Sequence, residues 1–145
     1  MVTLSGKPEI RWIHGKFWEA NSVADFWSKW NPVVHYSLLK LLRLVRRRLG
    51  TPNVVPPTIL AIFLFEGLLH DFLVWCVGFG AWNPKFCFTS FFLMNGVFVI
   101  VERFSGVSVL LPTIIKKILT FTWIICSFWI ALTLRNYFIR FATFP

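Results

Sequence analysis

Three ionisable side chains lie inside one apolar run of the chain, at Glu66, His70 and Asp71. An imidazole changes its charge near neutral pH, so His70 is a candidate general base. Glu66 and His70 are four residues apart and share one face of a helix, whereas Asp71 points about 100° away from His70. Two interpretations follow. His70 abstracts a proton in a reaction, or Glu66 and His70 form a hydrogen-bonded pair that holds their helix to a neighbour.

Ionisable groups at membrane depth are costly, by at least about 2.5–3.5 kcal/mol for an acid on insertion scales. They therefore face protein or a water-filled cavity. We expect neighbouring protein helices to shelter Glu66, His70 and Asp71 from lipid. Asn95 in the next apolar run is expected to hydrogen-bond across helices. Glu102 and Arg103 together are expected to form a charge pair at the membrane edge.

The sequence contains none of the common motifs of soluble enzymes. There is no GxSxG, P-loop, HExxH or dinucleotide-binding motif, and no Cys or His spacing typical of a metal site. We therefore expect no metal and no cofactor.

The composition predicts a membrane protein. Of the 145 residues, 57% are hydrophobic and 14% are charged, and the mean hydropathy is +0.67. Soluble domains are about 45–50% apolar and about 25% charged. We expect an all-α, multi-pass integral membrane protein. Its transmembrane region covers residues 53–145, with spans near 57–80, 86–102 and 113–134. The second span is close to the lower limit of about 17 residues.

Residues 1–52 are predicted to lie at the membrane surface, as an arm followed by an amphipathic helix. Ser22 and Asp25 resemble a capping box that opens a short helix over 23–30. Asn31 and Pro32 suit the start of the next helix, which Gly50 ends. Its predicted apolar face comprises Val34, Leu38, Leu41, Leu42, Val45 and Leu49, with Lys40, Arg43 and Arg47 opposite.

The net charge of +9 is concentrated at one end of the chain. Such a basic helix beside hydrophobic spans favours anionic phospholipid as a partner. The headgroup-binding residues are predicted to be Lys40, Arg43, Arg46, Arg47 and Arg48. No groove-reading motif accompanies the basic run, so we expect no nucleic-acid partner.

The distribution of basic residues also predicts the orientation in the membrane. Three spans place the N-terminal third on the same side as Arg103, Lys116 and Lys117, and leave Lys85, Arg135 and Arg140 opposite. By the positive-inside rule the N-terminus faces the cytosol or the mitochondrial matrix. The expected location is the endoplasmic reticulum or the mitochondrial inner membrane.

Two stretches resemble a known family. Residues 25–35, DFWSKWNPVVH, resemble the "FWxxWN…VH" segment of the membrane-bound O-acyltransferase (MBOAT) family. Residues 65–71, FEGLLHD, resemble its "SGLLH(E/D)" segment, especially in the wax-synthase-like branch, although Glu66 replaces the usual small or hydroxyl residue. Asn95-Gly96 and Glu102-Arg103 resemble the helix that follows. The resemblance covers about residues 20–105 and only the C-terminal portion of the family.

The resemblance implies roles for individual residues. Asn31 and His70 match the family's active-site pair, in which the histidine is the base on an acceptor hydroxyl that attacks an acyl-CoA thioester. Asn31 would orient the substrate, and Glu66, Asp71 and His35 would support the pair. In that family many more spans enclose the two residues, so we expect partner helices to complete any reaction chamber.

Two main functions therefore stay open, and a lipid-binding or lipid-scaffolding role of the basic helix is compatible with the first of them. The first is a small accessory or structural subunit of a larger membrane complex, such as a mitochondrial respiratory or ATP synthase assembly. This subunit would derive from an acyltransferase-like ancestor, contact lipid and have other membrane subunits as partners. The alternative is all or part of an O-acyltransferase that uses acyl-CoA as substrate. A tunnel joining His70 and Asn31 would favour the enzyme.

Overall fold

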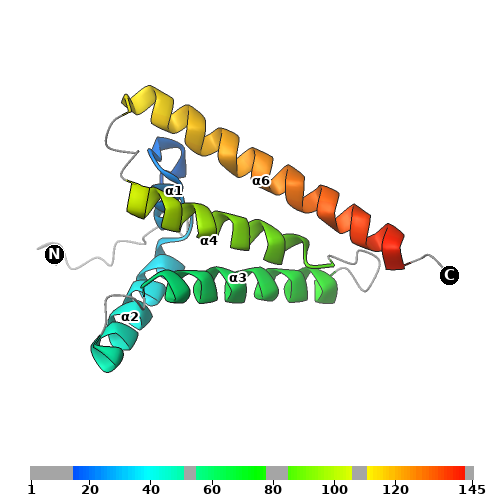
Figure 1. Cartoon of the computed structure of the whole chain (residues 1–145), viewed down its shortest axis with the longest axis horizontal. Helices are drawn as coiled ribbons and strands as arrows, with labels where there is room; N and C mark the ends of the chain where they lie inside the picture. Colours follow the sequence, from blue (N-terminus) through cyan, green and yellow to red (C-terminus); the bar gives the residue numbers. More distant parts are fainter. Residues whose placement is uncertain (1–14, 51–54, 78–84, 106–110, 143–145) are drawn as a thin grey trace, which may run out of the picture.

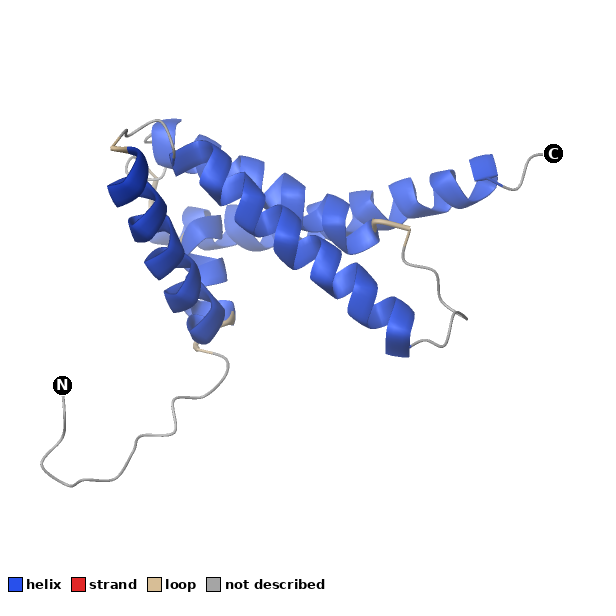
Figure 2. Cartoon of the chain, turned by 90° about the horizontal axis from the view of Figure 1, so that it is seen from below, coloured by secondary structure: helices blue, strands red, loops and turns tan. Residues whose placement is uncertain are grey.

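The chain folds into helices. The computed structural model describes residues 15–50, 55–77, 85–105 and 111–142, and within these ranges it contains five α-helices, one short 3-10 helix and no strand (Figure 2). The predicted all-α class is confirmed.

Three helices are long and apolar enough to cross a membrane. They are α3 (Val55–Val77), α4 (Cys87–Ser105) and α6 (Thr113–Ala142), the last over Thr113–Tyr137. Residues 78–80, the predicted end of the first span, lie outside the described residues. Helix α4 continues past the predicted end at 102, so its 19 residues rise about 28 Å and clear the lower limit for a span. Helix α6 also continues past its predicted end at 134.

The three spans run antiparallel in sequence order, with α4 between α3 and α6 (Figure 1). The closest approach is between α3 and α4 at Gly67, where an added Cβ would lie 2.5 Å from the Cα of Thr89. Gly96 on α4 also lies close to α3, since its added Cβ would lie 3.0 Å from the Phe63 side chain. Small residues thus bring the two backbones together, as is common between membrane helices.

A buried polar contact joins α4 to α6. Asn95 is fully buried, and its side-chain amide donates to Ser127 Oγ at 3.1 Å and to the carbonyl of Phe91 at 2.8 Å. The predicted hydrogen bond across helices is confirmed. Cys87, Phe92 and Ala131 are buried in the same core.

Helix α1 (Val23–Trp30) has the predicted bounds, and the short 3-10 helix η1 (Phe17–Glu19) precedes it. Ser22 Oγ accepts from the Asp25 amide at 2.9 Å, and the Asp25 carboxylate accepts from the Asn21 amide instead of the Ser22 amide. The predicted capping box is therefore present in a modified form.

Helix α1 contacts the spans, and the membrane-surface location of residues 1–52 stays a prediction. Its Trp27 ring packs on Phe63 of α3 and on Phe91 and Phe92 of α4, with centroids 5.0–5.8 Å apart. Helix α1 therefore packs against the spans beside the end of α4 (Figure 1). Hydropathy periodicity describes one helix at a time and cannot reveal this docking.

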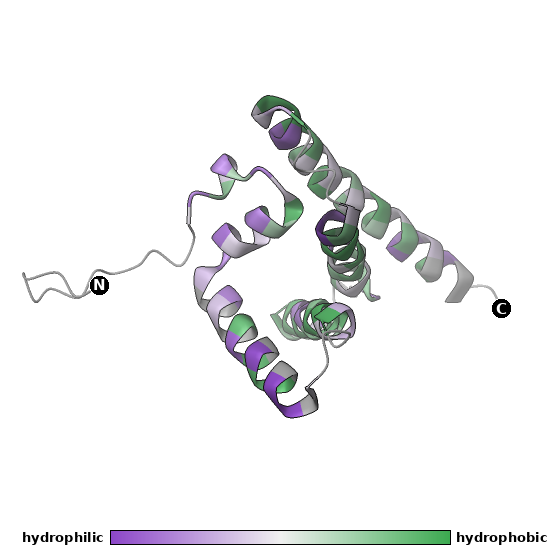
Figure 3. Cartoon of the chain, turned by 60° about the vertical axis from the view of Figure 1, so that its left-hand side comes forward, coloured by the Kyte–Doolittle hydropathy of each residue, from purple (hydrophilic) through white to green (hydrophobic). Residues whose placement is uncertain are grey.

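Helix α2 (Pro32–Leu49) leaves the spans at an angle (Figure 1). The carbonyl of Asn31 accepts from the His35 amide, and Gly50 has a φ of +65°, as a helix-ending glycine requires. Polar residues gather along this helix, whereas apolar residues dominate the spans (Figure 3). The basic side chains exposed on it are Lys40, Arg43, Arg47 and Arg48, and the side chain of Arg46 lies outside those described.

Candidate functional site

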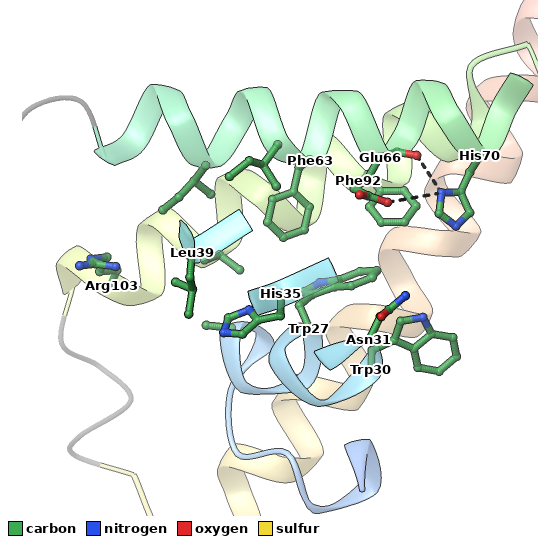
Figure 4. A pocket seen from close by; sticks show the side chains of 14 residues that line it. Trp27, Trp30, Asn31, His35, Leu39, Phe63, Glu66, His70, Phe92 and Arg103 are labelled. Carbon is green, nitrogen blue, oxygen red and sulfur yellow. Dashed lines mark hydrogen bonds and ion pairs between the residues drawn. The ribbon is translucent and has the colours of Figure 1, made fainter. Parts of the chain in front are cut away.

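A cavity of about 220 Å³ lies between the α1–α2 segment and the spans α3 and α4 (Figure 4). Apolar and aromatic side chains form most of its wall, including Trp27, Phe63 and Phe92. Its lining residues with polar or ionisable side chains, apart from the two tryptophans, are Asn31, His35, Glu66, His70 and Arg103. Asn31 and His70, the pair that the family resemblance singled out, therefore line one cavity although 39 positions separate them.

The surroundings of His70 determine which ring nitrogen carries the proton. Its Nδ1 lies 2.7 Å from the backbone carbonyl oxygen of Glu66. A carbonyl oxygen only accepts, so Nδ1 donates and the lone pair of the neutral ring is on Nε2. The ring packs on Phe92 with centroids 4.9 Å apart. His70 is therefore held in the tautomer and orientation that a general base at Nε2 requires.

The side chains of Glu66 and His70 lie near each other, but they do not form the predicted hydrogen bond. Glu66 Oε2 lies 4.0 Å from His70 Nδ1, at the limit of an ion pair. The two side chains are 16% and 43% exposed, respectively. The backbone carbonyl thus fixes the ring, and the Glu66 carboxylate adds a weaker contact from the cavity wall.

Asp71 does not line this cavity and serves the fold instead. Its carboxylate accepts from the backbone amides of Phe88 and Thr89, both at 2.9 Å, and from the Thr89 hydroxyl at 2.6 Å. It is 7% exposed. The expectation that neighbouring protein must shelter Asp71 is wrong, because the first turn of α4 offers unpaired N–H groups to a carboxylate.

Asn31 and His35 approach the cavity from the junction of α1 and α2. Figure 4 shows the Asn31 side chain and the His70 ring on facing walls. His35 lines the cavity from the first turns of α2. Partial burial lowers the pKa of His35 below its ordinary value of 6.5, so its ring is neutral at pH 7.

The sequence did not predict the contacts that Trp27 and Glu102 make. Trp27 lines the cavity and packs on Phe63 of α3 and Phe92 of α4, but nothing in its local sequence distinguishes it from an interfacial tryptophan. Glu102 was expected to pair with Arg103. Its carboxylate instead accepts from the amides of Val23 and Ala24, 79 and 78 residues earlier in the chain. Arg103 lines the cavity at the end away from His70 (Figure 4).

Within the described ranges, no group of three or more His, Cys, Asp or Glu side chains could hold a metal ion. Comparisons with protein-family models, curated proteins and solved structures found no match to this chain.

Proposed function

We propose that the cavity is an acyl-transfer centre, and that the chain is all or part of a membrane-bound O-acyltransferase. One observation carries this proposal: Asn31 and His70 line the same cavity. The contact of His70 Nδ1 with the Glu66 carbonyl oxygen leaves Nε2 as the ring atom that can take a proton. The family resemblance supplied the two residues, and the fold brings them to facing walls.

The reaction follows from these groups. Nε2 of His70 takes the proton of an acceptor hydroxyl while the hydroxyl oxygen attacks the carbonyl carbon of an acyl-CoA thioester. The carbon–sulfur bond then breaks, the thiolate of CoA takes the proton from the imidazolium, and an ester is released. The side-chain amide of Asn31 donates to an oxygen of the substrate and orients it. The apolar walls around Phe63 and Phe92 suit a fatty acyl chain.

The proposed setting is a membrane with an anionic leaflet. The basic helix α2, the end of α4 and the start of α6 lie at one end of the spans, and the end of α6, which carries Arg135 and Arg140, lies at the other (Figure 1). We place the α2 end on the cytosolic or matrix side, in the endoplasmic reticulum or the mitochondrial inner membrane. Lys40, Arg43, Arg47 and Arg48 would there contact phospholipid headgroups, together with Arg46.

The test is an acyl-transfer assay on the chain purified from membranes with the proteins that accompany it. Palmitoyl-CoA and a long-chain alcohol serve as probe substrates, and the ester product is quantified. His70→Ala should lower the rate by at least about 100-fold, because a general base contributes that much. Asn31→Ala should also lower it, by a smaller factor.

Matched controls separate chemistry from folding. Phe72→Ala changes an exposed residue of the same helix, and Asn136→Ala changes an exposed asparagine of α6, so both should retain the wild-type rate. An unchanged rate in His70→Ala, or no turnover in the intact preparation over a range of acyl chain lengths, contradicts the proposal.

The second candidate is the non-catalytic subunit of a larger membrane complex. It is favoured by the partial exposure of the His70 and Glu66 side chains, which at membrane depth require protein or water as neighbours. Purification in a mild detergent tests it. A stoichiometric membrane partner that protects Cys76 and Cys126, the exposed thiols of the spans, from alkylation, together with absence of turnover, would support this candidate over the enzyme.

A further inference from the structure

The carboxylate of Glu102 anchors α1 at the end of α4. Its two oxygens accept from the backbone amides of Val23 at 3.1 Å and Ala24 at 3.2 Å, the first two residues of α1. Ser22 Oγ accepts from the third amide, that of Asp25, at 2.9 Å. The amides of a first helical turn have no partner within their own helix, and a negative charge there is favourable. Two of the three N–H groups of this turn thus depend on a residue from another helix.

Helix α1 is too short to hold its place alone. Eight residues are well below the length at which an isolated helix is stable in water, so tertiary contacts determine where α1 lies. Those contacts are Glu102 at its first turn and the packing of Phe26 and Trp27 on the spans. Asn31 follows directly after the last residue of α1. A shift of the first turn therefore moves Asn31 along the cavity wall.

We propose that Glu102 is a positioning residue, which sets the place of Asn31 relative to His70 by anchoring α1; this inference rests on the proposed acyl transfer. Glu102 itself makes no contact with substrate in this scheme. Its neighbour Arg103 lines the cavity, so the same turn of α4 both anchors α1 and contributes to the wall.

The first measurement is steady-state kinetics on the full preparation, with palmitoyl-CoA and a long-chain alcohol as probes. Glu102→Leu removes both acceptor oxygens and should lower kcat by roughly 10- to 100-fold with little change in KM, since displacement of an orienting group by about 1 Å has effects of this size. Glu102→Gln keeps one acceptor oxygen and should recover part of the rate. The control Glu19→Leu makes the same change at an exposed acid that pairs with Lys16, and should leave both constants unchanged.

The second measurement needs no turnover. Spin labels at positions 18 on η1 and 65 on α3, both exposed, report the distance from the α1 region to the spans in a chain whose three cysteines are replaced by alanine. The wild type should give one narrow distance distribution. Glu102→Leu should broaden or shift it, Glu102→Gln should do so less, and Glu19→Leu should leave it unchanged.

The two measurements test the positioning role of Glu102 and the proposed acyl transfer separately. Unchanged distances in Glu102→Leu overturn the positioning role, whatever the rates are. An equal loss of kcat in Glu102→Leu and Glu19→Leu overturns it as well. No turnover in the wild type overturns the proposed function, and the distances then still decide whether Glu102 anchors α1.

Discussion

Helix α3 has two faces that use carboxylates in opposite ways. On the face toward the first turn of α4, Asp71 accepts three hydrogen bonds and is 7% exposed. On the cavity face, Glu66 has a single long contact of 4.0 Å with His70. The two acids are five positions apart, and both lie in the same apolar span.

The difference shows that an ionisable group in an apolar span can have either a structural or a functional role. A carboxylate whose oxygens are all used by backbone amides contributes to the fold, and no chemistry needs to be invoked for it. A carboxylate on a cavity wall beside an imidazole is available for a substrate. Hydropathy treats the two acids alike, and only their partners distinguish them.

The largest effect on stability is expected when the hydrogen bonds between Asp71 and α4 are removed. Asp71→Ala leaves the amides of Phe88 and Thr89 without partners at the start of α4, and should lower the free energy of unfolding by about 3 kcal/mol. Unfolding in mixed micelles with increasing dodecyl sulfate measures this change. Glu66→Ala is the matched control, and an equal loss in the two variants would remove the distinction between the faces.

The next largest effect on stability is expected at Gly67, where α3 and α4 approach each other closely. Gly67→Ala places a methyl group 2.5 Å from the Cα of Thr89, a backbone atom that cannot move aside without shifting the helix. We expect the free energy of unfolding to fall by about 2 kcal/mol, as in other overpacked sites. Leu68→Ala on the neighbouring, exposed position should cost less in the same unfolding experiment. The reverse ranking would contradict the packing described for α3 and α4.

A smaller effect on stability is expected on the cavity face. Glu66→Gln keeps the shape of the side chain and removes only a long contact, so the free energy of unfolding should change by less than about 1 kcal/mol. Thermal unfolding measures the stability, and the acyl-transfer assay measures the rate on the same samples. A destabilisation as large as that of Asp71→Ala would show that Glu66 is structural too.

The smallest effect is expected from His35, the second histidine of the cavity, which should make the free energy of unfolding depend on pH. Its pKa is lowered in the folded state by burial, so the unfolded chain takes up the proton first as the pH falls. The stability contribution is present above pH 6.5, the ordinary pKa of histidine, and declines as the pH falls below it. His35→Gln should remove this component from unfolding curves recorded between pH 7.5 and 5.5. Identical pH profiles for the two proteins would argue against the burial of His35.

The sequence predicts local features of this fold well. Helix α1 has its predicted bounds, because Ser22, Asp25 and the Asn31-Pro32 step are signals contained within a few residues. The start of α6 at Thr113 follows from hydropathy and Pro112 in the same way. The hydrogen bond of Asn95 was predictable in kind, since a polar residue in a span requires a partner, although Ser127 could not be named.

The remaining features depend on partners far along the chain. Asp71 binds amides 17 and 18 residues later, and Glu102 binds amides 78 and 79 residues earlier. Contacts between residues so far apart in the sequence cannot be predicted from hydrophobic periodicity or from the spacing of motifs. The meeting of Asn31 and His70 in one cavity likewise needs the docking of α1 on the spans, which the sequence suggested only through resemblance.

The anchoring of α1 by Glu102 has a consequence for biogenesis. Val23 leaves the ribosome long before its acceptor, which is synthesised 79 residues later. At 5–20 residues per second the delay is roughly 4–16 s. Helix α1 must therefore wait until α3 and α4 have been inserted before it can dock. Nascent chains stalled before residue 102 should show a reactive cysteine introduced at position 26, and chains stalled well after it should protect that cysteine.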